Sequence, residues 1–325
     1  MSNPQTPLLT ALKCLEKTIK AAPGIVVAYS GGMDSGFLAL AARRYHPREM
    51  MALLVASEFM SPHELDLAEG LARRFDIPLK RLEMKVLEHP IVCENPPDRC
   101  YHCKRAVFSR LREMVPPGWL LCDGSNTDDK NDFRPGKRAL VELNVASPLV
   151  EAGFSKALIR EALTSWHAEV FVRPAQACLA TRFPHGTHLT NLLLRRVADA
   201  ETLVRKAGFT QFRVRCHADI ARIELPPADH VRAVASLGAT VAAFKTLGFR
   251  HVTLDLEGYR MGSMNEPESG SAGQQTDGSP IPQTLQVSPT SKTSQTSQVA
   301  ADLQTEKSVP RGQAPGSPDS EGKKT

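Results

Sequence analysis

A glycine-rich loop, Ser30-Gly31-Gly32-Met33-Asp34-Ser35, follows an apolar run over residues 24–29. The run predicts a buried strand, and the residues after the loop predict a helix. Two glycines let backbone N–H groups approach phosphate oxygens, and the helix N-terminus adds partial positive charge there. The loop indicates a site for the phosphates of ATP, and the alternative is a glycine-rich turn without a ligand. It is neither a Walker loop nor the GxGxxG dinucleotide motif.

A second polar loop, Gly124-Ser125-Asn126-Thr127-Asp128-Asp129, follows another predicted strand at residues 119–123. Such residues can simply form turns and helix caps. If this polar loop lies beside the glycine-rich loop at residues 30–35, which we call the phosphate loop, its carboxylates need a cation between them and the phosphates of ATP. We therefore predict Mg²⁺, with Asp34 and Asp128 or Asp129 as its ligands.

Three cysteines have spacings or neighbours that suggest chemistry. The motif Cys100-Tyr101-His102-Cys103 could be a redox pair, half of a zinc site or part of an iron–sulfur site. Cys178 could be a small buried hydrophobic residue. Pro174 before it and Arg182 after it instead favour an exposed loop, in which a guanidinium would favour the thiolate. The helix and strand patterns place three other cysteines in the core: Cys14, Cys122 and Cys216. The position of Cys93 is left open.

Arg213 and Arg215 alternate on a predicted strand over residues 211–217, so both side chains lie on one face. Two guanidinium groups side by side suit a phosphate or a pair of carboxylates. The alternatives are an exposed cationic strand face, or ion pairs of these arginines with Glu201 and Glu224.

Strands and helices alternate in the first half of the chain. We predict strands at 24–29, 50–57, 79–83 and 119–123, with helices at 34–44, 61–75 and 104–114. This order predicts an α/β fold with a Rossmann-like parallel sheet, helices on both faces and ligands at the carboxyl ends of the strands. Three predicted loops leave that edge, at 30–35, 57–60 and 124–132.

The second half predicts a smaller α+β domain. Helices are expected at 155–166, 190–206 and 227–247, the last with a break near Gly238, and strands at 211–217, 220–225 and 251–256. Residues 262–325 contain no aromatic residue and no cysteine, and predict a disordered tail. The predicted domains are 1–150 for ATP, 151–261 for substrate and sulfur transfer, and 262–325 as the tail.

The formal net charge of +5 suits an anionic small molecule, and together with only four tyrosines it argues against a large nucleic-acid surface. Residues 1–21 show neither a secretion signal nor a membrane-spanning apolar run, so we expect a cytoplasmic protein without a membrane partner. Its cysteines would be mostly reduced there.

Taken together, the motifs resemble the LarE family within the PP-loop ATP pyrophosphatase superfamily. Members are ATP-dependent sulfur transferases that help to make the nickel-pincer nucleotide cofactor of lactate racemase. The resemblance covers about residues 10–258 and rests on five stretches: Ser30 to Ser35, Asn95 to Lys104, Gly124 to Asp129 with Arg134-Pro135-Gly136, Ser147-Pro148-Leu149, and Cys178-Leu179-Ala180-Thr181-Arg182.

The resemblance implies an adenine nucleotide alpha hydrolase-like fold and a substrate, pyridinium-3,5-biscarboxylic acid mononucleotide. ATP adenylates its carboxylate, and a cysteine sulfur attacks the activated carbon. The implied catalytic residues are Cys178 and Arg182, and the implied substrate-binding residues are Arg213, Arg215, Glu201 and Glu224. The predicted ATP-binding residues are Ala28, Ser30, Gly31, Gly32, Asp34, Ser35, Ser57, Gly124, Asn126 and Asp128.

Two sulfur sources remain open. In family members with one site cysteine, the equivalent of Cys178 gives up its sulfur and becomes dehydroalanine. Cys100 and Cys103 make this chain similar to members with three site cysteines, which resemble holders of a [4Fe-4S] cluster. In that case Cys178 would be a cluster ligand, and this is the interpretation that we favour.

The alternatives within enzymes are a PP-loop tRNA thiolase and an ammonia-using synthetase of the NAD or GMP type. A regulatory module that binds an adenine nucleotide is the non-enzymatic alternative. We also expect a homo-oligomer.

Overall fold

The computed structural model of the protein describes residues 6–131, 136–174 and 176–260. All of them belong to one compact unit that spans Met1–Pro267. The predicted tail and the motif residues Arg134 and Pro135 lie outside the described residues, as does Asp132 in the predicted 124–132 loop. The proposed boundary at residue 150 stays a prediction.

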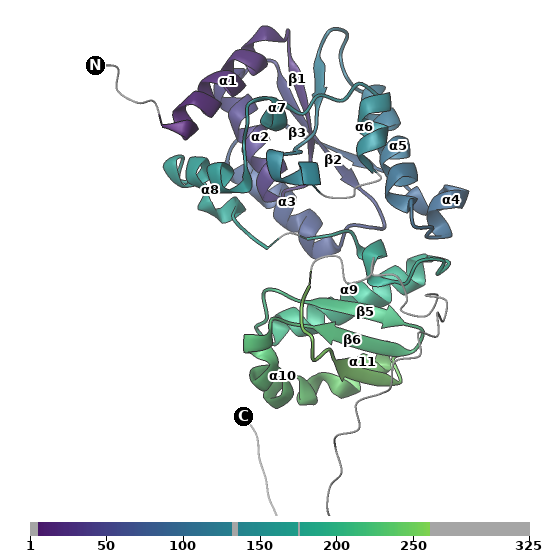
Figure 1. Ribbon diagram of the computed structural model, residues 1–325. Helices are drawn as coiled ribbons and strands as arrows, with labels where there is room; N and C mark the ends of the chain where they lie inside the picture. The colour runs from purple at the N-terminus through teal and green to yellow at the C-terminus, as the bar shows by residue number, and fades with distance from the viewer. Residues whose placement is uncertain (1–5, 132–135, 175, 261–325) are drawn as a thin grey trace, which may run out of the picture. The chain divides into compact units, whose positions relative to one another are not determined.

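The first half forms the predicted parallel sheet (Figure 1). Its strands are ordered β3-β2-β1-β4, and each neighbouring pair is parallel. Their bounds are β1 (Ile25–Tyr29), β2 (Met50–Ala56), β3 (Leu79–Glu83) and β4 (Leu120–Cys122). The predicted α/β fold class is confirmed, and β1 lies between β2 and β4 at the centre of the sheet.

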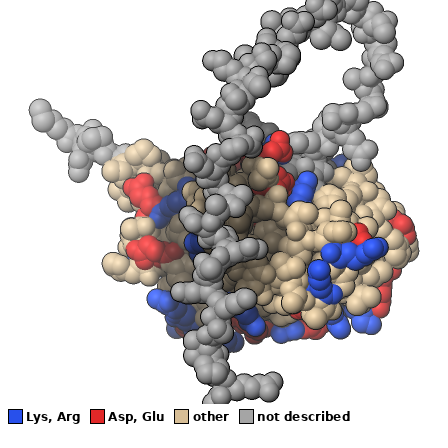
Figure 2. Space-filling model, turned by 90° about the horizontal axis from the view of Figure 1, so that it is seen from below, with Lys and Arg blue, Asp and Glu red and all other residues tan. Residues whose placement is uncertain are grey.

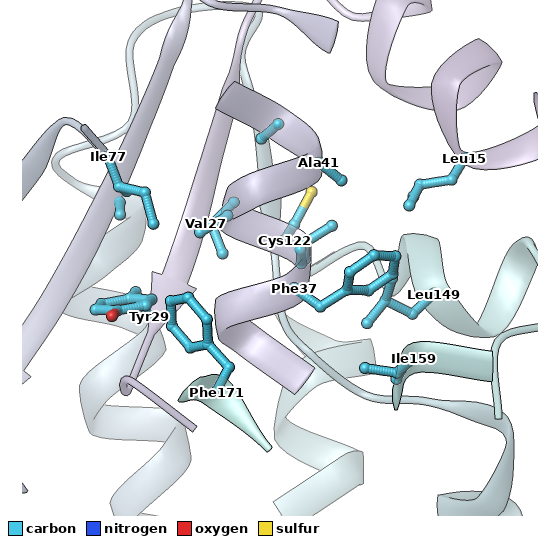
Figure 3. Close-up of a cluster of buried hydrophobic side chains, with 14 of the residues drawn as sticks. Leu15, Val27, Tyr29, Phe37, Ala41, Ile77, Cys122, Leu149, Ile159 and Phe171 are labelled. Carbon is cyan, nitrogen blue, oxygen red and sulfur yellow. The ribbon is translucent and has the colours of Figure 1, made fainter. Parts of the chain in front are cut away.

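Helices cover both faces of this sheet. Ile25, Val27 and Tyr29 of β1 point into one core, which Figure 3 shows, and the intervening Val26 points into the other. The first core is closed by α1 (Pro7–Ala21), α2 (Met33–Tyr45), α3 (Pro62–Arg74), α7 (Pro148–Glu151) and α8 (Lys156–Ser165). The second is closed by α5 (Arg99–Arg112) and α6 (Gly136–Glu142).

Two of the longer helices differ from the sequence-based expectation. Helix α1 was not predicted, although Thr6 caps it and its buried residues recur at helical spacing: Leu8, Ala11, Leu15 and Ile19. Helix α5 begins at Arg99 rather than at residue 104. The CxxC motif therefore spans the first and second turns of a helix, and both cysteines project from neighbouring positions on its surface.

The later part of the unit is the predicted α+β arrangement. Strands β5 (Arg213–His217) and β6 (Ile220–Glu224) are antiparallel, and β6 pairs in parallel with β7 (His251–Leu254). Helices α9 (Asn191–Lys206), α10 (His230–Leu237) and α11 (Val241–Thr246) pack on this sheet, and the break near Gly238 is confirmed.

The surface seen from below, in Figure 2, carries both acidic and basic side chains.

Short helices fill the connections. They are α4 (Pro90–Cys93) and the 3₁₀ segments η1 (Val86–Glu88), η2 (Thr127–Asn131), η3 (Glu169–Phe171), η4 (Leu179–Arg182) and η5 (Pro227–Asp229). The most informative is η4, because it follows Cys178 directly and its Leu179 and Ala180 are buried in the core below β5 and β6.

Candidate active site

The phosphate loop is a tight turn between β1 and α2, as predicted. Gly31 has a φ of +73°, and a Cβ there would lie 2.6 Å from Ala68 Cβ, so the position requires glycine. Ser35 Oγ accepts a hydrogen bond from Ser30 N at 3.2 Å and lies 3.1 Å from Ser30 Oγ. Helix α2 begins at Met33, which places its N-terminal N–H groups at the carboxyl end of β1.

The loop after β4 packs directly on the phosphate loop, which confirms that both lie at one sheet edge. A Cβ on Gly124 would lie 2.8 Å from Ser35 N, so only glycine allows this approach. Asn126 is fully buried, and its Oδ1 accepts from Asp128 N at 3.0 Å. Its Nδ2 has no hydrogen-bond partner among the described residues. A buried amide donor without a partner points to a ligand at this edge.

The carboxylates of this loop have protein partners. Asp128 Oδ2 accepts from Lys156 N at 2.8 Å, at the start of α8. Asp129 Oδ2 accepts from Asn126 N at 3.2 Å, and its Oδ1 lies 3.9 Å from Lys156 Nζ. Asp34 lies in the first turn of α2 with Oδ1 buried. Asp128 and Asp129 hold the loop against α8, and Mg²⁺ binding by the three carboxylates stays a prediction.

Hydrogen bonds attach the segment before and after Cys178 to this sheet edge. Arg173 Nη2 donates to the carbonyl of Gly31 at 2.5 Å. Leu179 N donates at 2.9 Å to the carbonyl of Phe59, in the predicted loop after β2 that starts at Ser57. The cysteine-bearing segment is therefore bonded to the loops that follow β1 and β2.

Arg99 joins the two cysteine motifs. Its side chain is buried, and its Nη1 donates to Asn95 Oδ1 and, at 3.1 Å, to the carbonyl of Ala180. Its Nη2 lies 3.5 Å from Cys100 Sγ and 3.9 Å from Cys178 Sγ. The two sulfurs therefore share one guanidinium nitrogen, although 78 positions separate them in the sequence. Both sulfurs can therefore accept a hydrogen bond from the same charged donor.

Cys103 belongs to the same group of thiols. Burial, followed by the neighbouring sulfurs of Cys178 and Cys100, raises the pKa of Cys103 to about 12. Cys103 and Cys178 are both partly buried against the core of the later sheet. The structure thus brings the three predicted cysteines together around Arg99.

The burial of the other cysteines agrees only in part with the prediction. Cys122 and Cys216 are buried, as expected. Cys14 is exposed, so its assignment to the core was wrong. It lies beside the buried Leu15 on α1, one position away from the apolar face of the helix. Cys93 is partly buried.

Arg182 holds the backbone of the segment around Cys178, which we call the cysteine loop. It is 1% exposed and forms a two-pronged ion pair with Glu201, with Nε 2.7 Å from Oε1 and Nη2 3.3 Å from Oε2. Its Nη1 donates to the carbonyls of Ala177 at 2.9 Å and Cys178 at 3.3 Å. These contacts orient the loop, whereas the guanidinium contacting the Cys178 sulfur is that of Arg99.

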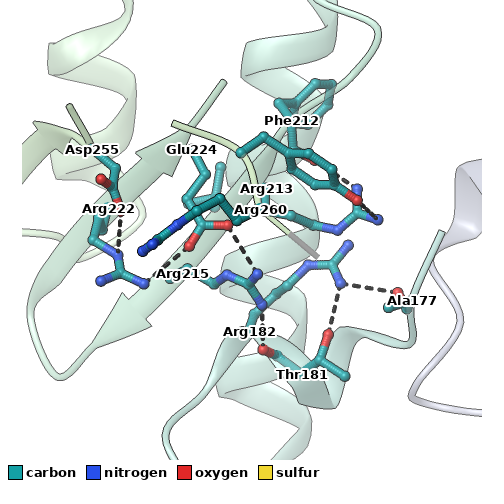
Figure 4. Close-up of polar contacts among 12 residues, drawn as sticks. Ala177, Thr181, Arg182, Phe212, Arg213, Arg215, Arg222, Glu224, Asp255 and Arg260 are labelled. Carbon is teal, nitrogen blue, oxygen red and sulfur yellow. Dashed lines mark hydrogen bonds and ion pairs between the residues drawn. The ribbon is translucent and has the colours of Figure 1, made fainter. Parts of the chain in front are cut away.

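Arg213 and Arg215 border the cysteine loop from β5 (Figure 4). Both are buried, at 3% and 5% exposure, so the alternative of an exposed cationic face is excluded. Arg213 Nη1 donates to Gln176 Oε1 at 3.0 Å. Arg215 donates to the Thr181 carbonyl at 2.6 Å and pairs with Glu224 at 2.9 Å. The anticipated pairing of an arginine with Glu224 is confirmed.

Positive charge accumulates around Arg213. Burial and then the charge of Arg182 lower the pKa of Arg213, and Arg215 acts in the same direction. Tyr259 and Glu201 only partly oppose these effects. A bound anion beside Arg213 would favour its charged form, so this region suits a phosphate or carboxylate group.

Several residues of the site had no predicted role. Asn95 and Arg99 are part of a motif that carried the family resemblance, but their partners lie far away in the sequence. Arg99 directly precedes the CxxC motif, which was the signal available. Arg173 and Glu64 were also missed. Burial raises the pKa of Glu64, and the charge of Arg182 opposes that rise.

No described helix is long and apolar enough to span a lipid bilayer.

Three curated proteins resemble the chain along most of its length, and no family model matches it. An uncharacterized protein of Synechocystis sp. is 37% identical over 244 residues, which cover 74% of this chain and 91% of the relative. An uncharacterized protein of Methanocaldococcus jannaschii is 29% identical over 238 residues, 73% of this chain and 90% of the relative.

The third relative has a named activity. It is the pyridinium-3,5-bisthiocarboxylic acid mononucleotide synthase of Lactiplantibacillus plantarum, and it is 34% identical over 274 residues. The match covers 82% of this chain and 95% of the synthase. With the phosphate loop and the cysteine segment bonded to one sheet edge, this similarity establishes that the chain belongs to the LarE family of pyridinium-3,5-bisthiocarboxylic acid mononucleotide synthases.

Proposed function

We propose that this enzyme is an ATP-dependent sulfur transferase that converts the carboxylates of pyridinium-3,5-biscarboxylic acid mononucleotide into thiocarboxylates. The name of the Lactiplantibacillus relative supports the product. The observation that carries the proposal is the pair of hydrogen bonds from Arg173 to Gly31 and from Leu179 to Phe59. They hold a cysteine segment at the edge where ATP is expected to bind. We further propose that the enzyme acts in the cytoplasm as a homo-oligomer.

ATP activates the carboxylate in the first step. The N–H groups at the start of α2 and the loop around Gly31 and Gly32 bind its phosphates, and the Asn126 amide supplies a donor at the same edge. The substrate carboxylate attacks the α-phosphorus, pyrophosphate leaves and an acyl adenylate forms. Asp34 would hold Mg²⁺, which supplies charge neutralisation for the leaving pyrophosphate.

The mononucleotide phosphate binds at the buried arginine pair. Arg213 and Arg215 contact the cysteine loop on both sides of Cys178, through Gln176 and Thr181. A phosphate held there places the rest of the substrate next to the cysteine segment. Glu224 fixes Arg215 in place, and Glu201 fixes Arg182.

Sulfur enters at the Cys100, Cys103 and Cys178 group. In the sacrificial route, the Cys178 thiolate attacks the acyl carbon and AMP leaves. Removal of the Cys178 Cα proton then breaks its Cβ–S bond, so the sulfur stays on the product and dehydroalanine stays on the protein. In that route Arg99 Nη2, which lies 3.9 Å from Cys178 Sγ, helps to hold the sulfur in place for attack.

The donor set also fits a [4Fe-4S] cluster, which is the route that we favour. Three cysteines gather around one buried guanidinium, whose charge offsets that of thiolates. The three sulfurs are not all within 4.8 Å of one another. They are therefore spaced more widely than three ligands of a single metal ion. A cluster held by Cys100, Cys103 and Cys178 would supply a sulfide at an iron that no protein ligand occupies. Inorganic sulfide would replace each sulfide that leaves with the product, so that repeated turnover leaves the chain intact.

The test uses the full chain purified without oxygen and incubated with ATP, Mg²⁺ and the dicarboxylated mononucleotide. We expect pyrophosphate, AMP and a thiocarboxylated nucleotide by mass spectrometry. Cys178→Ala should abolish sulfur transfer, whereas the exposed Cys14→Ser should retain it. Full activity of Cys178→Ala, or thiolation of tRNA in place of the nucleotide, would overturn the proposal.

The same sample separates the two routes. Loss of about one H₂S from the intact protein at Cys178 indicates sacrifice. A brown chromophore that disappears in Cys100→Ala, with unchanged protein mass after turnover, indicates the cluster.

A further inference from the structure

A second group of metal-ligating side chains lies outside the proposed sulfur site. Cys93 Sγ, a Glu94 carboxylate oxygen and a His188 ring nitrogen all lie within 4.8 Å of one another. His188 Nδ1 is 2.8 Å from Glu94 Oε1, and Cys93 Sγ is 3.9 Å from the same oxygen. Among the described residues, which include every histidine and cysteine of the chain, this is the one such group.

The donors match one kind of metal ion. Thiolate, imidazole and carboxylate are the three ligand types that Zn²⁺ takes in proteins. Zinc bonds of about 2.0–2.3 Å in a tetrahedron place neighbouring ligand atoms about 3.3–3.8 Å apart. The observed separations of 2.8 Å and 3.9 Å lie close to these values, so small side-chain rotations would complete the arrangement.

The backbone already holds the two segments together. Leu189 N donates to the Cys93 carbonyl at 2.7 Å, and Gly186 N donates to the Asn95 carbonyl at 2.9 Å. Asn95 Nδ2 donates to the Pro184 carbonyl at 2.7 Å. The ligands from both sides are therefore positioned without a metal ion, which reduces the entropy cost of binding one.

We propose that Cys93, Glu94 and His188 bind one Zn²⁺ ion, with water in the remaining position. Binding displaces the thiol proton that Cys93 now donates to the Pro90 carbonyl at 3.1 Å. A simple ion pair of Glu94 and His188 would add little at this exposed position and would not involve the thiol.

The site is adjacent to the turn that orients Arg99. Glu94 is followed by Asn95, whose Oδ1 accepts from Arg99 and whose Nδ2 binds the 184–189 segment. Zinc would bridge that turn and that segment a second time. Bound metal should therefore protect the turn from local opening, and this effect does not depend on the proposed sulfur chemistry.

The test measures zinc binding to metal-free, full-length protein by competition with a chromogenic chelator. All variants carry Cys100→Ala, Cys103→Ala and Cys178→Ala, so that the other thiols do not contribute. This background should bind one Zn²⁺, and Mg²⁺ in excess should not displace it. Cys93→Ser and His188→Ala should each weaken binding about 100-fold or more, because losing a ligand costs at least as much as losing its supporting contacts.

Matched controls make the result specific. His185→Ala removes an exposed histidine three positions from His188, and Cys14→Ser removes an exposed cysteine on α1. Both should bind zinc as the background does. Cobalt gives a second readout, since its thiolate charge-transfer absorption should vanish in Cys93→Ser and persist in Cys14→Ser. Unchanged zinc affinity in His188→Ala or Cys93→Ser, or an equal loss in His185→Ala, would refute the site.

Discussion

Replacing Arg99 by lysine tests whether this side chain organises the cysteine group. The guanidinium reaches four partners at once: Asn95 Oδ1, the Ala180 carbonyl, Cys100 Sγ and Cys178 Sγ. A lysine ammonium keeps the charge but is a single point that cannot reach both ends of this arrangement. The substitution therefore isolates the geometry of the fork from its charge.

The magnitude follows from the bonds that are lost. The two bonds of Arg99 to oxygen, those to Asn95 Oδ1 and to the Ala180 carbonyl, contribute about 1.5–3 kcal/mol each because the donor is charged, and a lysine would keep about one of them. We expect a net destabilisation of about 2–3 kcal/mol, which for a protein of this size lowers Tm by about 5–10 °C. Arg105→Lys is the matched control, since Arg105 is exposed on the same helix and should leave Tm unchanged.

Thermal unfolding by circular dichroism measures this difference. Alkylation of Cys178, followed by peptide mass spectrometry, adds a readout of the thiol itself. Arg99→Met removes the charge beside the sulfur and should slow alkylation about tenfold. If Arg99→Lys unfolds within about 1 °C of Arg105→Lys and Arg99→Met is alkylated at the normal rate, Arg99 does not organise this site.

The other predictions concern the sheet edge and the buried charges. Gly124→Ala should lower ATP-dependent pyrophosphate release at least about tenfold, because its Cβ would meet Ser35 N at 2.8 Å, whereas Gly238→Ala has open space and should be neutral. Arg213→Gln should raise the KM for the mononucleotide about tenfold or more with little change in the KM for ATP, as steady-state kinetics can establish. Burial raises the pKa of Glu64, so its ionisation opposes folding, and this cost grows as pH rises above the ordinary range of a glutamate. Glu64→Gln should therefore raise Tm at neutral pH and leave Tm unchanged at pH values where the unfolded carboxyl is protonated. A gain in Tm at acid pH that disappears at neutral pH would contradict this.

Local patterns predicted the elements whose signals are complete within a short window. The apolar runs of β1 and β2 and the caps of α3 and α9 are of this kind, and their ends agree with the structure within a few residues. The start of α5 was missed because Arg99 to Cys103 has no amphipathic pattern. Its first turn is fixed instead by contacts with distant parts of the chain, such as the bond from Arg99 to Ala180.

The site shows the same division. The residue types at Cys100, Cys103 and Cys178 predicted a thiol centre, but the sequence could not tell that one guanidinium lies between two of them. Burial of Arg213 and Arg215 was equally invisible, since alternation shows only that the two side chains share a face. Whether that face is covered depends on Gln176 and Thr181, which approach from another segment.

The bond between Leu179 and Phe59 limits how far Cys178 can travel. Consecutive Cα atoms are about 3.8 Å apart, so Cys178 stays within one residue of a fixed point on the sheet edge while that bond is intact. A swinging arm that carries sulfur between separate centres is not compatible with such a short tether. In both proposed sulfur routes the acceptor therefore has to come to the region of Cys178, and a substrate with two carboxylates has to be presented in two orientations, one for each round of transfer.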